Sequence, residues 1–179
     1  MTWSRRGTFR WTELRSLGFG RSRPRRDADR KEALPIRELQ TVTAADLARI
    51  VIELELRNLI SRIAILADQG DLNEYANQFT EDCVWALPNA PRHGRADIRA
   101  GAQMRRAKGL TGPGSASRHV ITNVSVSIDG PDEARADSYF MFFQNTTTVP
   151  TILNMGSYRD RFVRQGDTWR LARREITFG

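Results

Sequence analysis

The spacing of apolar residues divides the chain into a helical first half and a second half of strands. From Thr43 to residue 67, apolar positions recur at three- and four-residue intervals, which predicts one long helix. Thr43 followed by Asp46 three positions later is a helix start signal. The apolar positions first follow one face of this helix and then shift to another. We therefore expect the helix to be largely enclosed by the rest of the protein.

Two shorter helices and one strand are predicted next. Asp71 before Leu-Asn-Glu is typical of a helix N-cap, with Glu74 reaching back, and Gly70 is expected to be the left-handed residue that ends the long helix. Residues 81–87 predict a short strand, closed by Pro-Asn-Ala-Pro. Residues 94–109 predict a third helix, which is weakly amphipathic through Ile98, Ala102 and either Met104 or Arg105.

The second half is rich in β-branched and aromatic residues separated by turn signals. It predicts four antiparallel strands, at residues 117–128, 133–146, 151–164 and 168–178. Helices followed by a run of strands predict an α+β domain over residues 43–179, with the helices on one face of a curved sheet.

The first of these strands has two chemically different faces. Strict alternation would place Val120, Thr122, Val124, Val126 and Ile128 on one face, and His119, Ile121, Asn123, Ser125 and Ser127 on the other. If the helices cover the His119 face, the valine stripe needs another partner. We therefore expect a homodimer or a higher homo-oligomer that forms through this stripe.

The positive charge of the chain is concentrated before the predicted domain. The formal net charge is +7, and residues 1–42 hold 11 of the 28 Lys/Arg and 5 of the 21 Asp/Glu. This segment shows no sustained helical or strand period, so it is interpreted as a basic, disordered extension or as the result of a start codon placed too far upstream. Its arginines and its two tryptophans could also touch nucleic acid. The nearly neutral remainder argues against a nucleic-acid partner for the domain.

Composition limits the setting of the protein. The longest apolar runs are far shorter than the roughly 20 residues of a membrane-spanning helix, so no membrane partner is expected. Cys83 is the single cysteine and cannot form an intramolecular disulfide, which favours a reducing, cytoplasmic location. We expect Cys83 to be a small buried residue near the start of a strand.

Candidates for chemistry are few. Of the two histidines, His93 lies in a Pro/Gly loop and is expected to be exposed, whereas His119 opens a strand. No His, Cys or carboxylate spacing typical of a metal site occurs, so no metal is expected. Asp68 needs an explanation, because it lies in the last turn of an apolar helix, where the helix dipole disfavours a negative charge.

Four segments together resemble the SnoaL-like family, whose fold is shared with scytalone dehydratase, ketosteroid isomerase and dioxygenase β subunits. They are "ADQGDLNEYANQFTEDCVWAL", "HGRADIRA", "SRHVITNV" and "MGSYRDRFVRQGDTWRLARREI", and the resemblance covers about residues 43–179. It implies a cone-shaped α+β barrel in which the N-terminal helices pack in the concave face of a curved, mainly antiparallel sheet around an apolar pocket.

The resemblance also implies site residues and a function. It assigns Asp68 and His119 as a catalytic pair. The residues themselves add candidate contacts to a hydrophobic small molecule, which are the aromatic Trp85, Tyr139 and Tyr158 together with Asn123 on the predicted His119 face. The implied function is a cofactor-independent lyase or isomerase with dehydratase-like or cyclase-like proton transfer. Ala67 stands where scytalone dehydratase-like sites carry tyrosine, and the strand at 133–146 lacks their second histidine. A non-catalytic ligand-binding or structural module like the dioxygenase β subunits therefore stays as the alternative.

Overall fold

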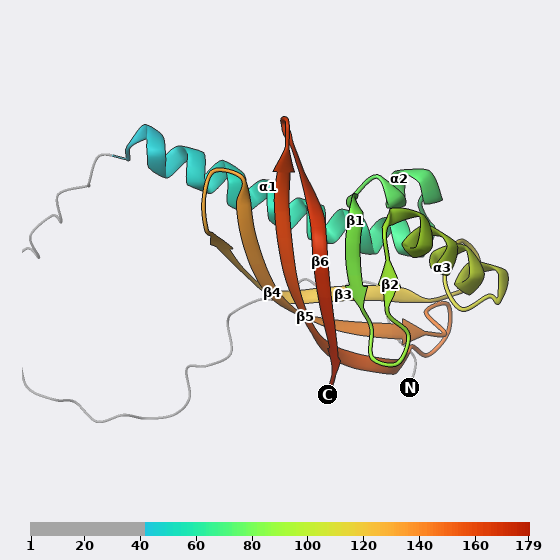
Figure 1. Ribbon diagram of the computed structural model, residues 1–179. Helices are drawn as coiled ribbons and strands as arrows, with labels where there is room; N and C mark the ends of the chain where they lie inside the picture. Colours follow the sequence, from blue (N-terminus) through green and yellow to red (C-terminus); the bar gives the residue numbers. More distant parts are fainter. Residues whose placement is uncertain (1–41) are drawn as a thin grey trace, which may run out of the picture. The chain divides into compact units, whose positions relative to one another are not determined.

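The computed structural model describes residues 42–179, in which three helices pack on one six-stranded sheet (Figure 1). Most of the predicted basic extension lies outside the described residues, and residues 42–179 belong to one compact unit. Along the chain the elements are α1 (Ala44–Gln69), α2 (Leu72–Ala76), β1 (Phe79–Ala86), β2 (Arg92–His93), α3 (Arg95–Ala107), β3 (Arg118–Ile128), β4 (Glu133–Gln144), β5 (Thr151–Gln165) and β6 (Thr168–Phe178).

The sheet is curved, mixed and open. Its strand order is β2-β1-β6-β5-β4-β3, in which β3 to β6 form an antiparallel meander and β1 runs parallel to β6. The α+β class with helices against a mainly antiparallel sheet is thereby confirmed. The barrel of the sequence prediction is not closed, because β2 and β3 are the two edges of the sheet and do not pair with each other.

Helix α1 is enclosed over only part of its length. Its start is as predicted, with Thr43 and Asp46 forming a reciprocal capping box. The C-terminal half is buried against the sheet through Leu56, Leu59, Ile60, Ile63 and Leu66. The apolar stripe of the N-terminal half is about half exposed, because this end of α1 projects beyond the sheet (Figure 1), and it consists of Leu47, Ile50, Val51 and Leu54. The expectation of a largely enclosed helix therefore holds for the C-terminal half of α1 and is wrong for its N-terminal half.

A β-bulge in β3 overturns the predicted alternation of its faces. The register to β4 shifts between Thr122 and Ser125, and Asn123 has a φ of 52°. The extra residue reverses the face on which each later side chain lies. As a result Val124 and Val126 pack against the core on the same side as Ile121, and the predicted outer stripe of valines does not exist.

The joint between α1 and α2 is tightly built. Asp71 caps α2 by accepting hydrogen bonds from the backbone N–H groups of Asn73 and Glu74. Gly70 is extended, with a φ of −88°, and not left-handed as predicted. Glycine is required for a different reason, since a Cβ there would lie 2.8 Å from the Cα of Leu66.

No helix within residues 42–179 is long and apolar enough to cross a membrane.

Candidate functional site

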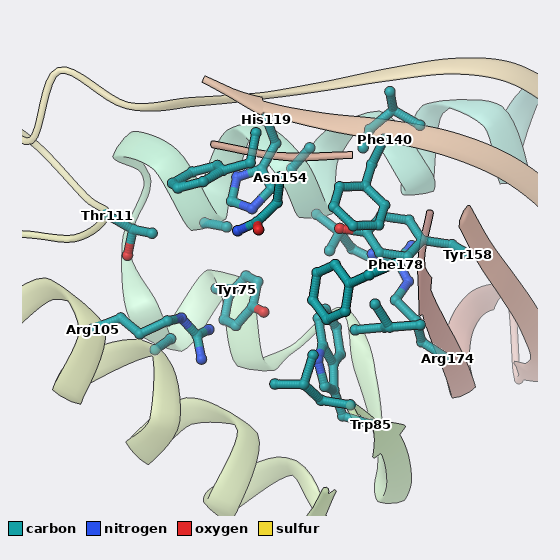
Figure 2. A pocket seen from close by; sticks show the side chains of 18 residues that line it. Tyr75, Trp85, Arg105, Thr111, His119, Phe140, Asn154, Tyr158, Arg174 and Phe178 are labelled. Atoms are coloured by element: carbon teal, nitrogen blue, oxygen red, sulfur yellow. The ribbon is translucent and has the colours of Figure 1, made fainter. Parts of the chain in front are cut away.

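A partly enclosed cavity of about 190 Å³ lies between the helices and the inner face of the sheet. Eighteen residues line it, contributed by all three helices, by β1, β3, β4, β5 and β6, and by the loops that follow β1 and α3. Most of the lining is apolar. The polar groups that face the cavity are the two phenols Tyr75 and Tyr158 together with Arg105, Thr111, His119, Asn154 and Arg174 (Figure 2).

Asp68 and His119 are directly hydrogen-bonded at this cavity. The carboxylate Oδ1 lies 2.6 Å from Nδ1 of His119, and Oδ2 accepts a hydrogen bond of 2.7 Å from the backbone N–H of the same residue. The side chain of Asp68 is only 4% exposed, whereas that of His119 is 22% exposed and lines the cavity. One carboxylate therefore both fixes the start of β3 and orients the imidazole.

This arrangement defines the tautomer of the histidine. An ionised carboxylate can only accept hydrogen bonds, so the neutral imidazole carries its proton on Nδ1. Nε2 then has a free lone pair and can take a proton from a bound molecule. The carboxylate would stabilise the imidazolium that forms.

The position of Asp68 at the end of α1 has a local physical basis. Its carboxylate receives two hydrogen bonds from His119, which offset the unfavourable carbonyl end of the helix dipole. Arg106 adds to this by donating from Nη2 to the carbonyl oxygens of Leu66 and Gly70 at 2.7 and 2.8 Å. A positive charge is thereby held at the helix end that carries the aspartate.

A second ion pair lies in the wall of the same cavity. Arg174 donates from Nε and Nη2 to the two carboxylate oxygens of Asp160 at 2.7 and 2.6 Å, and both residues are buried. The guanidinium lies 4.0 Å from the ring centre of Tyr158 and 5.1 Å from that of Trp85. Burial acts to lower the pKa of Arg174, but the charge and hydrogen bonds of Asp160 outweigh it and raise the pKa above its ordinary value. Burial also raises the pKa of the Asp160 carboxyl, and the charge and hydrogen bonds of Arg174 oppose this effect.

The two tyrosines that face the cavity stay protonated at neutral pH. Burial raises the pKa of Tyr75 and of Tyr158 above the usual value of a phenol, and the charge of Arg174 only partly opposes this effect. Tyr158 is also stacked on Phe140, with ring centres 4.4 Å apart. Neutral phenols of this kind are hydrogen-bond donors for a carbonyl or enolate oxygen.

The structure places the six predicted site residues in two groups. Asp68 and His119 pair at the cavity, and Trp85 and Tyr158 line it. Tyr139 and Asn123 do not line it. Tyr139 alternates with the inward-facing Ser138 and Phe140 and lies on the outer face of β4, and Asn123 occupies the exposed bulge of β3. Their assignment as ligand contacts fails for these reasons.

Several cavity residues escaped the sequence analysis. Arg174 is turned inward because the register between β5 and β6 shifts between Arg161 and Phe162, which breaks the alternation of β6. For Arg105 a signal existed, since it follows Ile98 and Ala102 at helical spacing and shares their face of α3, whereas Met104 is exposed. No pattern in the sequence marks Tyr75, Thr111 or Asn154 as cavity residues.

The remaining predicted positions agree with the structure. His93 is exposed in β2, and Cys83 is fully buried in β1. Burial raises the pKa of Cys83 to about 12, so this thiol is an inert packing group. Within residues 42–179, no three side chains of the His, Cys, Asp or Glu type come together to hold a metal ion.

Helices set against a curved open sheet, with a cavity between them, define a class of α+β proteins. Residues 48–175 match the SnoaL-like domain, and the chain belongs to this family. No protein of curated function matches the sequence.

Three solved structures from Novosphingobium aromaticivorans have the same fold. An NTF2-like protein with a cystatin-like fold is 27% identical with a TM-score of 0.65, over 77% of this chain and 91% of that one. A candidate scytalone dehydratase is 19% identical with a TM-score of 0.59, over 73% and 86%. The β subunit of a candidate aromatic-ring-hydroxylating dioxygenase is 19% identical with a TM-score of 0.61, over 73% and 91%.

Proposed function

We propose that this protein is a cofactor-independent lyase or isomerase that moves a proton on a hydrophobic small molecule. The observation that supports this most is the pairing of Asp68 with His119 at the edge of a mostly apolar cavity. A neutral imidazole with a free Nε2 is a general base suited to neutral pH. An apolar setting also strengthens the electrostatic effect of each nearby dipole.

The proposed chemistry begins at a carbon next to a carbonyl group. His119 Nε2 takes the proton from that carbon, and the electron pair of the C–H bond forms an enolate. Tyr75 and Tyr158, as neutral donors, are the residues suited to stabilise its oxygen. The imidazolium can return the proton to another carbon, which is an isomerisation. It can instead protonate a leaving hydroxyl group, which departs as water in an elimination.

Proton exchange measures this step without knowledge of the natural reaction. The protein is incubated in D₂O with a panel of cyclic and aromatic ketones, and loss of the α-proton signal is followed by NMR. Wild type should catalyse exchange, and His119→Gln should lose it. His93→Gln is the matched control, because His93 is exposed and does not line the cavity. Equal exchange in wild type and His119→Gln would contradict the proposal.

A non-catalytic ligand-binding or structural module is the second candidate. The observation in its favour is that Asp68 Oδ2 accepts the backbone N–H of His119, since this bond gives the carboxylate a structural purpose without any catalysis. The fold shared with a dioxygenase β subunit is compatible with it. Under this hypothesis His119→Gln binds co-purified small molecules, identified by mass spectrometry, as wild type does, and no ketone exchanges its protons.

We also propose that the protein forms a homodimer or a higher homo-oligomer in the cytoplasm, through the outer face of the sheet. The surface that supports this differs from the predicted valine stripe. It crosses three strands, because Val120 of β3 pairs with Met141 of β4, which pairs with Met155 of β5, and Tyr139 lies next to this row. Val120, Tyr139 and Met155 are substantially exposed. Light scattering should detect a dimer that Met155→Lys converts to a folded monomer.

A further inference from the structure

The charges that face the cavity are balanced at all positions except one. None of the eighteen lining residues is Asp or Glu, and the basic ones are His119, Arg174 and Arg105. His119 is paired with Asp68, and Arg174 is paired with Asp160. The side chain of Arg105 has no ion pair or hydrogen bond to any residue in the described part of the chain, 42–179. Arg105 is therefore an unmatched cation.

The position of Arg105 differs from that of the other basic residues on α3. Arg105 is partly buried and shares the inward face of the helix with Ile98 and Ala102. The guanidinium of Arg106 donates hydrogen bonds to the carbonyl oxygens at the end of α1, and Lys108 is exposed. The charge of Arg105 acts on the interior, because it opposes the burial that raises the pKa of Tyr75 and of Tyr158.

One polar side chain without a partner among the described residues, Thr111, lies at the same end of the cavity as this cation. Thr111 is buried and makes no side-chain hydrogen bond to residues 42–179, yet it lines the cavity. Figure 2 shows Arg105 and Thr111 at one end of the cavity, with the phenol of Tyr75 next to them. The opposite end in the same view is formed by aromatic rings, those of Trp85, Phe140 and Phe178. His119 and Asn154 lie between the two ends.

We infer that the ligand of this cavity is an aromatic or polycyclic carboxylic acid, with its carboxylate on Arg105 and Thr111 and its ring body against Trp85, Phe140 and Phe178. The inference rests on the proposed function, in that the same molecule would present its reactive carbon to His119. A guanidinium forms two parallel hydrogen bonds with a carboxylate, and a hydroxyl donor can add a third. The single unmatched positive charge fits a monoanion better than it fits a phosphate dianion.

The test compares a negatively charged probe with a neutral analogue of similar shape. Naphthylacetate and naphthylacetamide have the same ring and nearly the same shape, and their affinities for the protein are measured by calorimetry at neutral pH. Since a hydrogen bond to a charged group contributes about 1.5–3 kcal/mol, wild type should prefer the acid by roughly tenfold or more. Arg105→Met should lose this preference, and Arg105→Lys should keep part of it. Lys108→Met is the matched control and should keep all of it.

Three results would overturn the inference. They are equal affinities of wild type for the acid and the amide, an unchanged preference in Arg105→Met, and no saturable binding of either probe. The proposed function is tested separately, by the proton-exchange comparison of wild type with His119→Gln. A protein that prefers the acid but exchanges no ketone protons refutes the proposed function and supports the assignment of Arg105.

Discussion

Two pairs of a carboxylate with a basic side chain border the cavity, and they differ in almost every physical respect. Asp160 and Arg174 lie on adjacent antiparallel strands, are both buried and are joined by two hydrogen bonds. Asp68 and His119 join the end of a helix to the start of a strand, and the histidine is partly open to the cavity. The first pair is enclosed, and its guanidinium donates to both carboxylate oxygens. The second contains a histidine, the kind of side chain that changes its charge most readily near neutral pH.

The difference indicates how the site divides its tasks. A buried ion pair beside aromatic rings connects β5 to β6 and shapes the wall at Trp85 and Tyr158. A titratable pair at a junction can accept and release a proton while the carboxylate keeps the imidazole in place. The first pair therefore matters most for stability, and the second for reactivity.

The largest expected effect is on stability, from breaking the buried pair of Asp160 and Arg174. Arg174→Met should lower the free energy of unfolding by about 3–5 kcal/mol, because it leaves the carboxylate of Asp160 buried without a partner. Chemical denaturation followed by circular dichroism measures this loss. The double variant Asp160→Leu/Arg174→Met should recover much of it, since no charge is then left buried. A single variant as stable as wild type would remove the contrast between the two pairs.

The second effect falls on turnover, from changing one atom of the titratable pair. The amide of Asp68→Asn can accept the backbone N–H of His119 with its oxygen and donate to Nδ1 with its nitrogen. The imidazole would then carry its proton on Nε2, and the base would be lost. We expect proton exchange to fall by about 10²–10⁴-fold, with only a small change in melting temperature.

Asp68→Ala separates the structural task from the chemical one. It removes both hydrogen bonds, so the start of β3 loses its attachment to α1 and stability should fall by about 1–3 kcal/mol. NMR of the His119 ring nitrogens reports the tautomer in each variant. An unchanged tautomer in Asp68→Asn, together with full activity, would show that the pair is only an anchor.

The sequence predicted where the helices and strands lie better than which of their side chains face the core. Caps, turns and periodicity are local, and Thr43, Asp71 and the four long strands were found close to their observed bounds. A bulge depends on how a strand meets its neighbour, so the alternation rule misplaced Asn123 and missed Arg174. The same limit applies to the exposed half of α1, because its burial depends on how far the sheet reaches.

The candidate site was foreseeable only in part. Asp68 stood out because a carboxylate at a helix C-terminus is unfavourable, but its partner lies 51 residues away and came from the family resemblance alone. Trp85 and Tyr158 were named because they are aromatic, and the sequence did not show on which face of the sheet their side chains lie. Arg105 was visible as a cation on the apolar side of a helix, and only the arrangement of all three helices shows that it faces the cavity.

The smallest expected effect concerns a third carboxylate, Asp71, which lies three residues after Asp68 and is fully exposed. Hydrogen bonds from the backbone N–H groups of Glu74 and Asn73 lower the pKa of Asp71 below its ordinary value. A carboxylate with a lowered pKa in the folded state adds stability above the pKa of the unfolded chain, and this stability is lost as the pH falls through the folded value. Asp71→Asn keeps an oxygen that accepts both hydrogen bonds but cannot ionise. Its melting temperature should lie slightly below that of wild type at neutral pH, and the two should converge below about pH 4. A difference that stays constant down to pH 3 would mean that the charge of Asp71 contributes nothing, whereas the effect of Asp68→Asn on turnover would be untouched, because the two aspartates serve different elements.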